Sequence, residues 1–419
     1  GEPMTRKLNR IALAALLALT LSPPLPAQQA QQAQPQAPPS EVQQFEEILS
    51  ASPEHVGMWV EMAAAQARAG NKAEAVKWLE KAAARGLDFD VADELSYAQL
   101  RETPEFKAVA AKIQANRKVV DRSKMAFQVA DKELIPEGIA HDPKTGDFFL
   151  GSLSKQKIVR VTKDGKASDF KTSGQDGLWD VLGMKVDPAT RTLWVGSAAS
   201  AVAGELEGSA GLFQFDLKTG KLLAKHVLPG KPERHLLNDL AFGKGGEIFV
   251  TDSEGRAVHR LRPGKTELEI FIAPGTFIYP NGIASSPDGK KLFVADFTKG
   301  ISVVDVATGQ VRPLTYPERV NVYGVDGLYF HKGDLVAVQN GSGTSRIVRF
   351  RLGKTMEAIE SEEVLESRNP RFDIPTTGVV VGRSLYYIAN SQLDRLDQGR
   401  IKKDAKLVEP VVLQVPLGR

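Results

Sequence analysis

The chain has 419 residues, which is long for one compact domain unless the fold is built from repeats. Its 54 Lys and Arg residues nearly balance its 51 Asp and Glu residues, and the net charge of +3 gives no electrostatic case for a nucleic-acid partner or an acidic membrane surface. The sequence has no cysteine, which excludes disulfides, thiolate metal sites and cysteine nucleophiles. Apolar residues make up 42%, enough to build a sizeable core.

The N-terminal segment has the pattern of an export signal. The basic stretch MTRKLNR, which starts at Met4, precedes an almost wholly apolar run over residues 11–21. Such a run is too short to cross a bilayer as a helix, but it fits the hydrophobic part of a signal peptide. We therefore expect residues 1–27 to be a signal peptide cut after Ala27, and the protein to be periplasmic or secreted without stable membrane insertion. An uncleaved amphipathic anchor is the alternative.

A low-complexity segment and a helical domain follow. Residues 28–39, QQAQQAQPQAPP, lack apolar periodicity and predict a disordered linker. Residues 40–120 predict a small helical domain, which begins with a capping box formed by Ser40 and Gln43. Residues 53–69 predict a second helix.

A third helix is expected from Asn71, as its N-cap, to about Gly86. Through Trp59, Ala63, Ala75, Leu79 and Ala82, the helical pair resembles a tetratricopeptide repeat. The resemblance covers about one and a half repeats, and such units usually need about three copies to be stable alone. We expect a structural cap that docks on the next domain, and a groove for a protein partner is the alternative. The helix faces expected to point inward carry Trp59, Met62, Ala63, Ala75, Leu79 and Ala82.

From Phe127 onward the sequence changes to short β-rich runs separated by Gly, Pro and Asp. One phrase recurs six times: a leading residue, usually a small residue, a short strand, a turn and a second strand. Its copies are EGIAHDPKTGDFFLGS, LGMKVDPATRTLWVGS, NDLAFGKGGEIFVTDS, NGIASSPDGKKLFVAD, DGLYFHKGDLVAVQN and TGVVVGRSLYYIAN. The leading residues are Glu137, Leu182, Asn238, Asn281, Asp326 and Thr377, at steps of 45, 56, 43, 45 and 51 residues.

Steps of this size with about four strands per unit are typical of β-propeller blades. We therefore predict a mainly β fold, a six-bladed β-propeller over residues 125–419 that follows the helical domain. The run VVLQVPL near the C-terminus is expected to pair with AFQVAD near residue 127 and close the ring. A parallel α/β fold is the rival, but no helix-length periodic segment lies between the strands.

The leading residues open the innermost strands, so they are expected to converge around the central channel. Four of the six carry side-chain oxygens, and two of those four are carboxylates. Calcium prefers 6–8 oxygen ligands of this mixed kind. Each Asn-Gly or Asp-Gly pair is also a common turn dipeptide when taken alone. The shared phase of the four residues favours a Ca²⁺ site on the propeller axis.

The region from Glu137 to about Asn390 resembles the superfamily of regucalcin-type gluconolactonases, paraoxonases and diisopropylfluorophosphatase. The motifs that carry the resemblance are PEGIAHDP, LLNDLAF, YPNGIASSPDGKKLFVAD and YGVDGLYF. The resemblance implies a six-bladed propeller with an axial calcium. The residues that match the family's calcium ligands, in chain order, are Glu137, Asn238, Asn281 and Asp326.

The sequence departs from the family in two places. The sugar-lactonase branch has a substrate-binding Arg two residues before the first Asn ligand, where this chain has Leu236. The neighbouring His235 is expected to point elsewhere, because side chains alternate along a strand. No histidine pair matches the paraoxonase pattern securely, and His141 and His331 are expected in blade turns. Asp239 is a candidate for a second metal, or for a cap of the turn at Asn238.

The resemblance implies a calcium-dependent hydrolase of a lactone or related ester. Asp326 would bind calcium and also orient or deprotonate water, or attack directly. A non-catalytic propeller that binds a protein or a glycan is the alternative, and strictosidine-synthase-like chemistry is a third. The residues expected near the mouth, each of which has blade packing as its simpler role, are Trp179, Asp180, Asp239, Phe277, Tyr279 and Tyr323.

Overall fold

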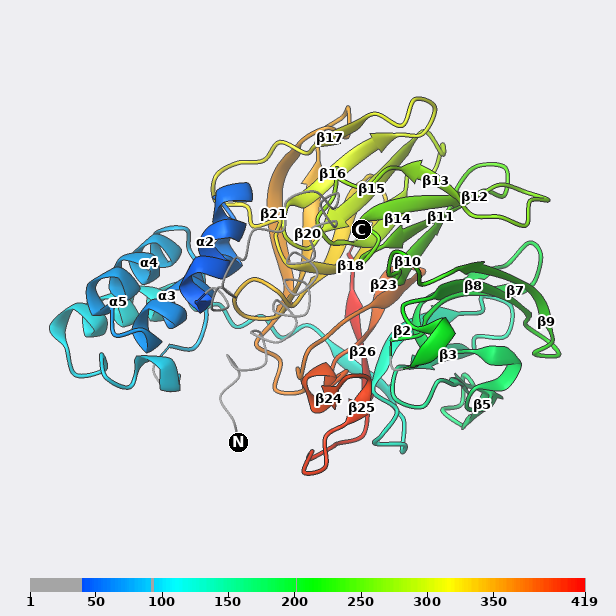
Figure 1. Cartoon of the computed structure of the whole chain (residues 1–419), viewed down its shortest axis with the longest axis horizontal. Helices are drawn as coiled ribbons and strands as arrows, with labels where there is room; N and C mark the ends of the chain where they lie inside the picture. The colour runs from blue at the N-terminus through cyan, green and yellow to red at the C-terminus, as the bar shows by residue number, and fades with distance from the viewer. Residues whose placement is uncertain (1–39, 92–93, 201, 419) are drawn as a thin grey trace, which may run out of the picture. The chain divides into compact units, whose positions relative to one another are not determined.

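The computed structural model describes residues 40–91, 94–200 and 202–418 (Figure 1). The signal peptide expected over residues 1–27 and the linker expected over residues 28–39 lie outside these ranges. The chain divides into a helical unit, which ends at Arg117 and includes Ser342–Thr344, and a β unit that contains the rest from Lys118. Within the described residues, no helix combines the length and the apolar character that crossing a bilayer requires.

The helical unit contains α2 (Glu41–Ala51), α3 (Val56–Arg68), α4 (Lys72–Ala84), η1 (Leu95–Tyr97) and α5 (Pro104–Ala115). The capping box is confirmed: Gln43 N donates to Ser40 Oγ at 3.3 Å, and Ser40 N donates to Gln43 Oε1 at 2.8 Å. The second helix begins three residues later than predicted, because His55 Nδ1 accepts a hydrogen bond from Met58 N and forms the N-cap.

Asn71 lies at the N-cap of α4, but its side chain does not cap the helix. It donates instead to Gln66 Oε1 at 2.7 Å, which ties the start of α4 to the end of α3. The predicted inward face is confirmed, since each of its members is at most 1% exposed. Small alanines on both helices let the two backbones approach closely. The tetratricopeptide resemblance and the partner groove stay predictions. The buried residues in question are Trp59, Met62, Ala63, Ala75, Leu79 and Ala82.

The β unit is a six-bladed propeller, as the sequence predicts. Its blades are six four-stranded antiparallel sheets that follow one another in chain order (Figure 1). Blade 1 contains β2 (Pro136–His141), β3 (Phe148–Ser152), β4 (Ile158–Val161) and β5 (Ala167–Lys171). Blade 2 contains β6 (Asp180–Asp187), β7 (Thr192–Ala198), β8 (Ala210–Asp216) and β9 (Leu222–Leu228). Blade 3 contains β10 (Leu237–Phe242), β11 (Ile248–Asp252), β12 (Ala257–Leu261) and β13 (Glu269–Ile272).

The remaining blades have the same four-strand order. Blade 4 contains β14 (Pro280–Ser285), β15 (Lys291–Asp296), β16 (Gly300–Asp305) and β17 (Val311–Pro313). Blade 5 contains β18 (Val325–His331), β19 (Asp334–Gln339), β20 (Arg346–Leu352) and β21 (Ile359–Ser367). Blade 6 contains β22 (Gly378–Val381), β23 (Ser384–Ile388), β26 (Val411–Pro416) and β1 (Lys124–Gln128), and a small hairpin, β24 (Leu396–Asp397) and β25 (Arg400–Ile401), precedes β26.

Blade 6 closes the ring by joining the two ends of the propeller. Strand β26 pairs with β23 on one side and with β1 on the other, where Phe127 lies opposite Val412. This confirms the predicted pairing of VVLQVPL with AFQVAD. Closure in this way leaves only short outer edges unpaired, which reduces the risk of edge-to-edge association.

The six innermost strands surround a central channel. Each of them contacts the innermost strand of the next blade, and β22 contacts β2. One cavity of about 400 Å³ is lined by residues of all six strands, most of them two to four positions beyond the leading residues. Apolar clusters fill the spaces between the blades; one of them joins Phe149 of blade 1 to Val195 and Phe213 of blade 2. Burial between blades therefore fixes the channel and the residues around it.

Candidate metal centre

The leading residues lie where the innermost strands depart from regular pairing. In blades 1 to 5 the register between the first two strands shifts across the leading residue and the one after it. In blade 4, for example, Pro280 pairs with Asp296 and the next regular pair is Ile283 with Val294. Irregularities of this kind re-aim side chains, and they recur next to functional sites. The leading residue therefore lies outside the regular strand pairing in each of these blades.

Glycine after the leading residue lets neighbouring strands approach at the axis. A Cβ at Gly138 would lie 1.9 Å from the carbonyl oxygen of Leu182. A Cβ at Gly282 would lie 2.4 Å from the carbonyl oxygen of Asp326. Because backbone atoms cannot move aside as a flexible side chain can, a larger residue at either position would push two blades apart.

The four predicted ligands are all buried, with exposures between 4% and 6%. Each keeps one buried side-chain oxygen without a hydrogen-bond partner in the described part of the chain. A buried polar atom without a partner is destabilising, so four of them at one phase of the repeat fit a site for a bound cation. The unpartnered atoms are Glu137 Oε2, Asn238 Oδ1, Asn281 Oδ1 and Asp326 Oδ1.

Burial and neighbouring carboxylates raise the pKa values of the two acidic members of this group. Burial and then the charges of Asp326 and Asp239 raise the pKa of Glu137 well above its usual range. Burial also raises the pKa of Asp326 to about 7; contacts with Asn340 and Asn281 oppose this rise, and the charge of Asp239 adds to it. Among the described residues, no basic side chain forms an ion pair with Glu137 or Asp326. A cation would satisfy the unpartnered oxygens and relieve the repulsion.

The donor set fits calcium. Two carboxylates and two amide carbonyls are hard oxygen ligands, and no nitrogen ligand is among them. The other two leading residues do not compete for the ion. Leu182 packs in an apolar cluster with Trp194 and Leu237, and the Thr377 hydroxyl donates to the carbonyl oxygen of Glu137. Water or substrate would complete the 6–8 oxygens that calcium takes.

Two further residues hold the ligands, and the sequence reasoning missed both. Asn340 donates from Nδ2 to Asp326 Oδ2 at 2.6 Å. Ser253 accepts a hydrogen bond from Asn238 Nδ2 at 3.0 Å and donates to the carbonyl oxygen of Pro280 at 2.6 Å. Both follow the second strand of their blade, at the same phase of the repeat. A polar residue at that phase was the signal in the sequence.

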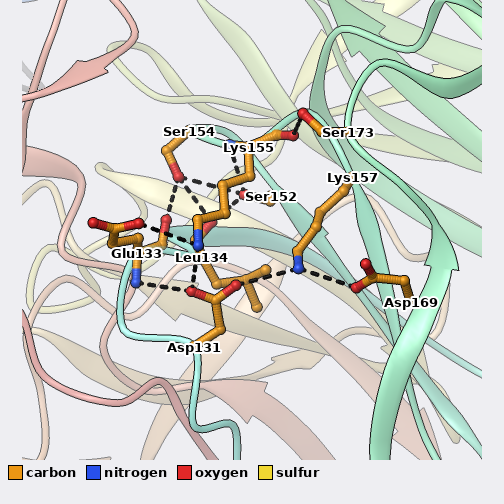
Figure 2. A network of polar contacts seen from close by, with 9 residues as sticks. All are labelled: Asp131, Glu133, Leu134, Ser152, Ser154, Lys155, Lys157, Asp169 and Ser173. Atoms are coloured by element: carbon orange, nitrogen blue, oxygen red, sulfur yellow. Dashed lines mark hydrogen bonds and ion pairs between the residues drawn. The ribbon is translucent and has the colours of Figure 1, made fainter.

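A network in blade 1 fixes the segment that leads into the strand of Glu137 (Figure 2). Lys155 Nζ lies 2.7 Å from Asp131 Oδ1, and Lys157 Nζ bridges Asp131 at 3.2 Å and Asp169 at 3.0 Å. Burial raises the pKa of Asp131, but the hydrogen bonds from the two lysines outweigh it and leave the pKa lowered. The lysines therefore stabilise the charged carboxylate and tie the start of β2 to the outer strands.

Two of the residues expected at the mouth lie near the axial group. The half-buried Tyr279 has a raised pKa, mainly from burial and then from the charges of Glu254, Asp326 and Glu137. Asp239 Oδ1 lies 3.3 Å from Lys185 Nζ, and its Oδ2 accepts from Ile283 N at 3.3 Å. Asp239 thus links blade 3 to a lysine of blade 2 and to the backbone of blade 4, and its role at a second metal stays a prediction.

The other mouth candidates have packing or hydrogen-bonding roles. Trp179 and Phe277 are buried in two of the apolar clusters. Tyr323 is 5% exposed, and its hydroxyl lies 3.1 Å from that of Tyr316. Asp180 accepts from Gln156 Nε2 at 3.2 Å, and burial raises its pKa to about 6. These contacts agree with the simpler role that the sequence allowed for each aromatic residue.

The histidines expected in blade turns lie at the ends of strands. His141 is the last residue of β2 and His331 the last of β18, each directly before a turn. His141 also lines the cavity in the channel. The ring of His235 points away from the axial group, as predicted, because it contacts Asp252; the residue lies before β10, so strand alternation is not the reason.

No protein-family model matches the chain, and no curated protein sequence matches it. Among solved structures, the chain is similar to a gluconolactonase from Xanthomonas campestris at 16% identity and a TM-score of 0.49, over 72% of this chain and 98% of that one. It is similar to a calcium-binding regucalcin from Agrobacterium tumefaciens at 18% identity and 0.48, over 70% and 96%. An aldose sugar dehydrogenase from Streptomyces coelicolor matches at 15% identity and 0.46, over 70% and 98%. At these identities the similarity is one of fold, and the six-bladed β-propeller predicted from the repeat is the fold of this chain.

Proposed function

We propose that the protein is an exported calcium-dependent hydrolase of a lactone or a related ester. The observation that carries the proposal is the set of four buried oxygens without partners, one from each residue of the predicted ligand group. The residues that would hold the ion are Glu137, Asn238, Asn281 and Asp326. When bound there, calcium would polarise the substrate carbonyl and stabilise the oxyanion. Export would place the protein where calcium reaches the millimolar levels that suit a weak site.

Asp326 is the proposed catalytic residue. Asn340 holds its Oδ2, while its Oδ1 has no partner among the described residues, so one oxygen is fixed and the other is free. In addition to its contact with the ion, Oδ1 would orient a water molecule and accept its proton as the water adds to the carbonyl. Asp326 would return the proton to the leaving oxygen as the acyl–oxygen bond breaks, which gives a hydroxy acid from a lactone, or an acid and an alcohol from an ester. Direct attack by Asp326 is the alternative route for the same residue.

Tyr279 is a candidate for contact with the substrate. Its hydroxyl is in a buried environment that senses the charges of both Asp326 and Glu137. A neutral phenol in such a position can donate a hydrogen bond to a substrate oxygen. Leu236, at the position of the family's substrate-binding Arg, points to a substrate with fewer anionic or hydroxyl groups than a sugar acid lactone.

Metal analysis of the purified protein tests the metal part of the proposal. We expect about one calcium per chain, which Asp326→Asn loses. The matched control is Asp164→Asn, which changes an exposed aspartate in the turn after β4. Absence of calcium binding in roughly millimolar calcium would refute the site.

A panel of lactones and aryl esters tests the catalytic part. Turnover is expected in calcium, and EDTA is expected to abolish it until calcium is restored. Asp326→Asn should lose activity while Asp164→Asn retains it. If the protein binds calcium but turns over no member of the panel, the non-catalytic scaffold that binds a protein or a glycan becomes the better reading.

A further inference from the structure

A second group of metal-ligating side chains lies in blade 3, apart from the axial oxygens. Its members are His235, in the segment before β10, Asp252, the last residue of β11, and His259 in β12. One ligand atom from each lies within 4.8 Å of the other two. His235 Nδ1 is 2.5 Å and His259 Nε2 is 3.1 Å from Asp252 Oδ2. Two neighbouring strands of blade 3 and the segment that enters its first strand thus bring these atoms together.

The two oxygens of the Asp252 carboxylate have different partners: backbone N–H groups for one and imidazole rings for the other. Its Oδ1 accepts from Leu236 N at 2.9 Å and from Gly255 N at 2.8 Å, which fixes the side chain in a fully buried position. Its Oδ2 faces the two rings. Burial raises the pKa of Asp252, but the hydrogen bonds from the two histidines outweigh it, and the pKa is lowered.

Blade 4 shows that the blade turn itself needs no histidine. Asp296 occupies the same register position in β15 and is also fully buried. Backbone N–H groups satisfy it: Ile278 and Tyr279 donate to Oδ2, and Thr298 donates to Oδ1. In blade 3 the two imidazoles contact Asp252 Oδ2, whereas in blade 4 backbone N–H groups donate to Asp296 Oδ2. A buried aspartate at this register position can thus be satisfied without imidazoles.

The buried ring of His259 is a further observation on this group. The side chain is 4% exposed, and its Nδ1 has no hydrogen-bond partner in the described residues. Whichever nitrogen carries the proton, one ring atom stays unsatisfied, and this costs stability. Such a cost is expected where a side chain is retained for binding rather than for the fold.

We propose that His235, Asp252 and His259 bind one divalent transition-metal ion of the zinc class. Two imidazole nitrogens and one carboxylate oxygen are ligands typical of zinc, and they contrast with the oxygen-only axial group that suits calcium. Bond lengths of about 2.0–2.2 Å place tetrahedral ligands roughly 3.3–3.5 Å apart, so side-chain shifts on the order of 1 Å complete the site. Three protein ligands leave a fourth position for water, and His235, at 13% side-chain exposure, lies on the accessible side.

Calorimetric titration of the full-length protein with Zn²⁺ tests this assignment. The protein is first stripped with EDTA, dialysed and returned to roughly millimolar calcium, so that the axial oxygens are not available to zinc. We expect one zinc per chain. His235→Gln, which changes the most exposed ligand, should weaken binding by at least about tenfold, and His259→Gln should do so too. His331→Gln, at the end of β18, is the matched control and should bind zinc as the unchanged protein does.

Thermal unfolding distinguishes a metal site from a cluster that only forms hydrogen bonds within the fold. Zinc should raise the unfolding temperature of the unchanged protein and of His331→Gln, but not that of His235→Gln, because only a ligand that binds the folded state shifts its stability. Absence of zinc binding in the unchanged protein would overturn the proposal and leave the cluster as a hydrogen-bonded pin. Zinc binding that survives both His235→Gln and His259→Gln would overturn the location. Neither outcome affects the calcium site, which Asp326→Asn tests separately.

Discussion

Asn340 donates from Nδ2 to Asp326 Oδ2 at 2.6 Å and also to the carbonyl oxygen of Pro375 at 2.9 Å. It therefore links the proposed catalytic carboxylate of blade 5 to the segment that enters blade 6. The Asn340 Oδ1 is buried and has no partner among the described residues, like the oxygens of the predicted calcium ligands. The amide thus orients one oxygen of Asp326 and leaves the other available.

Asn340→Ala should weaken calcium binding about tenfold, because partners that orient a metal ligand typically contribute on that scale. Isothermal titration with Ca²⁺ measures the change. Asn390→Ala is the control: Asn390 is equally buried and follows the second strand of blade 6, but its contacts are with Glu409 and Val411. Equal calcium affinity in the two variants would contradict the role of Asn340.

Gly282→Ala should destabilise the propeller by about 2–4 kcal/mol and weaken calcium binding, because a Cβ there would meet backbone atoms of blade 5. The nearest are Asp326 O at 2.4 Å and Leu328 N at 2.7 Å. Denaturant unfolding and calcium titration give the two readouts. Gly353→Ala is the comparison, since its nearest neighbour is the flexible end of Glu360 at 3.2 Å. A normal calcium affinity in a folded Gly282→Ala protein would show that close approach of the blades is not needed.

The link between Asp142 and Arg191 predicts a loss of stability in acid. Asp142 follows β2 of blade 1, and Arg191 lies in the β6–β7 turn of blade 2. The Asp142 carboxylate accepts hydrogen bonds from both terminal nitrogens of Arg191. Burial raises the pKa of Asp142, but the hydrogen bonds from Arg191 and from neighbouring groups outweigh it and lower the pKa from 3.8 to about 2. Because the folded protein binds the proton more weakly than the unfolded chain, the stabilisation is complete above pH 4 and is lost as the pH falls toward 2.

Asp142→Asn should therefore reduce stability by about 1–2 kcal/mol at neutral pH and by much less near pH 2. Urea unfolding across this range measures it. Asp164→Asn, in an exposed turn of the same blade, should change stability little at any pH. An equal loss at both ends of the range would show that the carboxylate charge is not the cause.

Glu61 predicts the opposite pH dependence in the helical unit. Its side chain is buried on α3, and burial raises its pKa from 4.5 to about 8, against the opposing charge of Arg68. The folded helices hold a proton that the unfolded chain releases, so stability falls as the pH rises from about 4.5 to 8. Glu61→Gln should raise stability by about 1–3 kcal/mol at pH 8 and flatten the pH dependence.

The helical circular dichroism signal during guanidinium unfolding follows this change. Glu46→Gln, on the exposed face of α2, is the control and should keep the pH dependence of the unchanged protein. A pH dependence that persists in Glu61→Gln would assign it to another group.

Much of the candidate site could be located from the sequence because the leading residue recurs at one phase of every blade. Phase identified Glu137, Asn238, Asn281 and Asp326 as a group, and the structure buries all four with one unpartnered oxygen each. The same reasoning could not separate the aromatic candidates. Trp179 and Tyr279 both precede an axial position, yet Trp179 packs in an apolar cluster while the charges of Asp326 and Glu137 raise the pKa of Tyr279, because strand twist and blade packing decide which way a side chain turns.

The sequence by itself determined the six repeats, the ring closure and the leading residues, because these depend on local strand and turn patterns that repeat along the chain. Only the tertiary structure decided which side chains meet within a blade: Asn340 at Asp326, Ser253 at Asn238, and Asp252 between His235 and His259. These contacts join residues from separate strands through bulges and shifts of register, which no local pattern encodes. The proposed calcium ligands were visible as a phase, whereas the proposed zinc ligands of blade 3 share no phase and meet only because β11, β12 and the segment before β10 lie side by side.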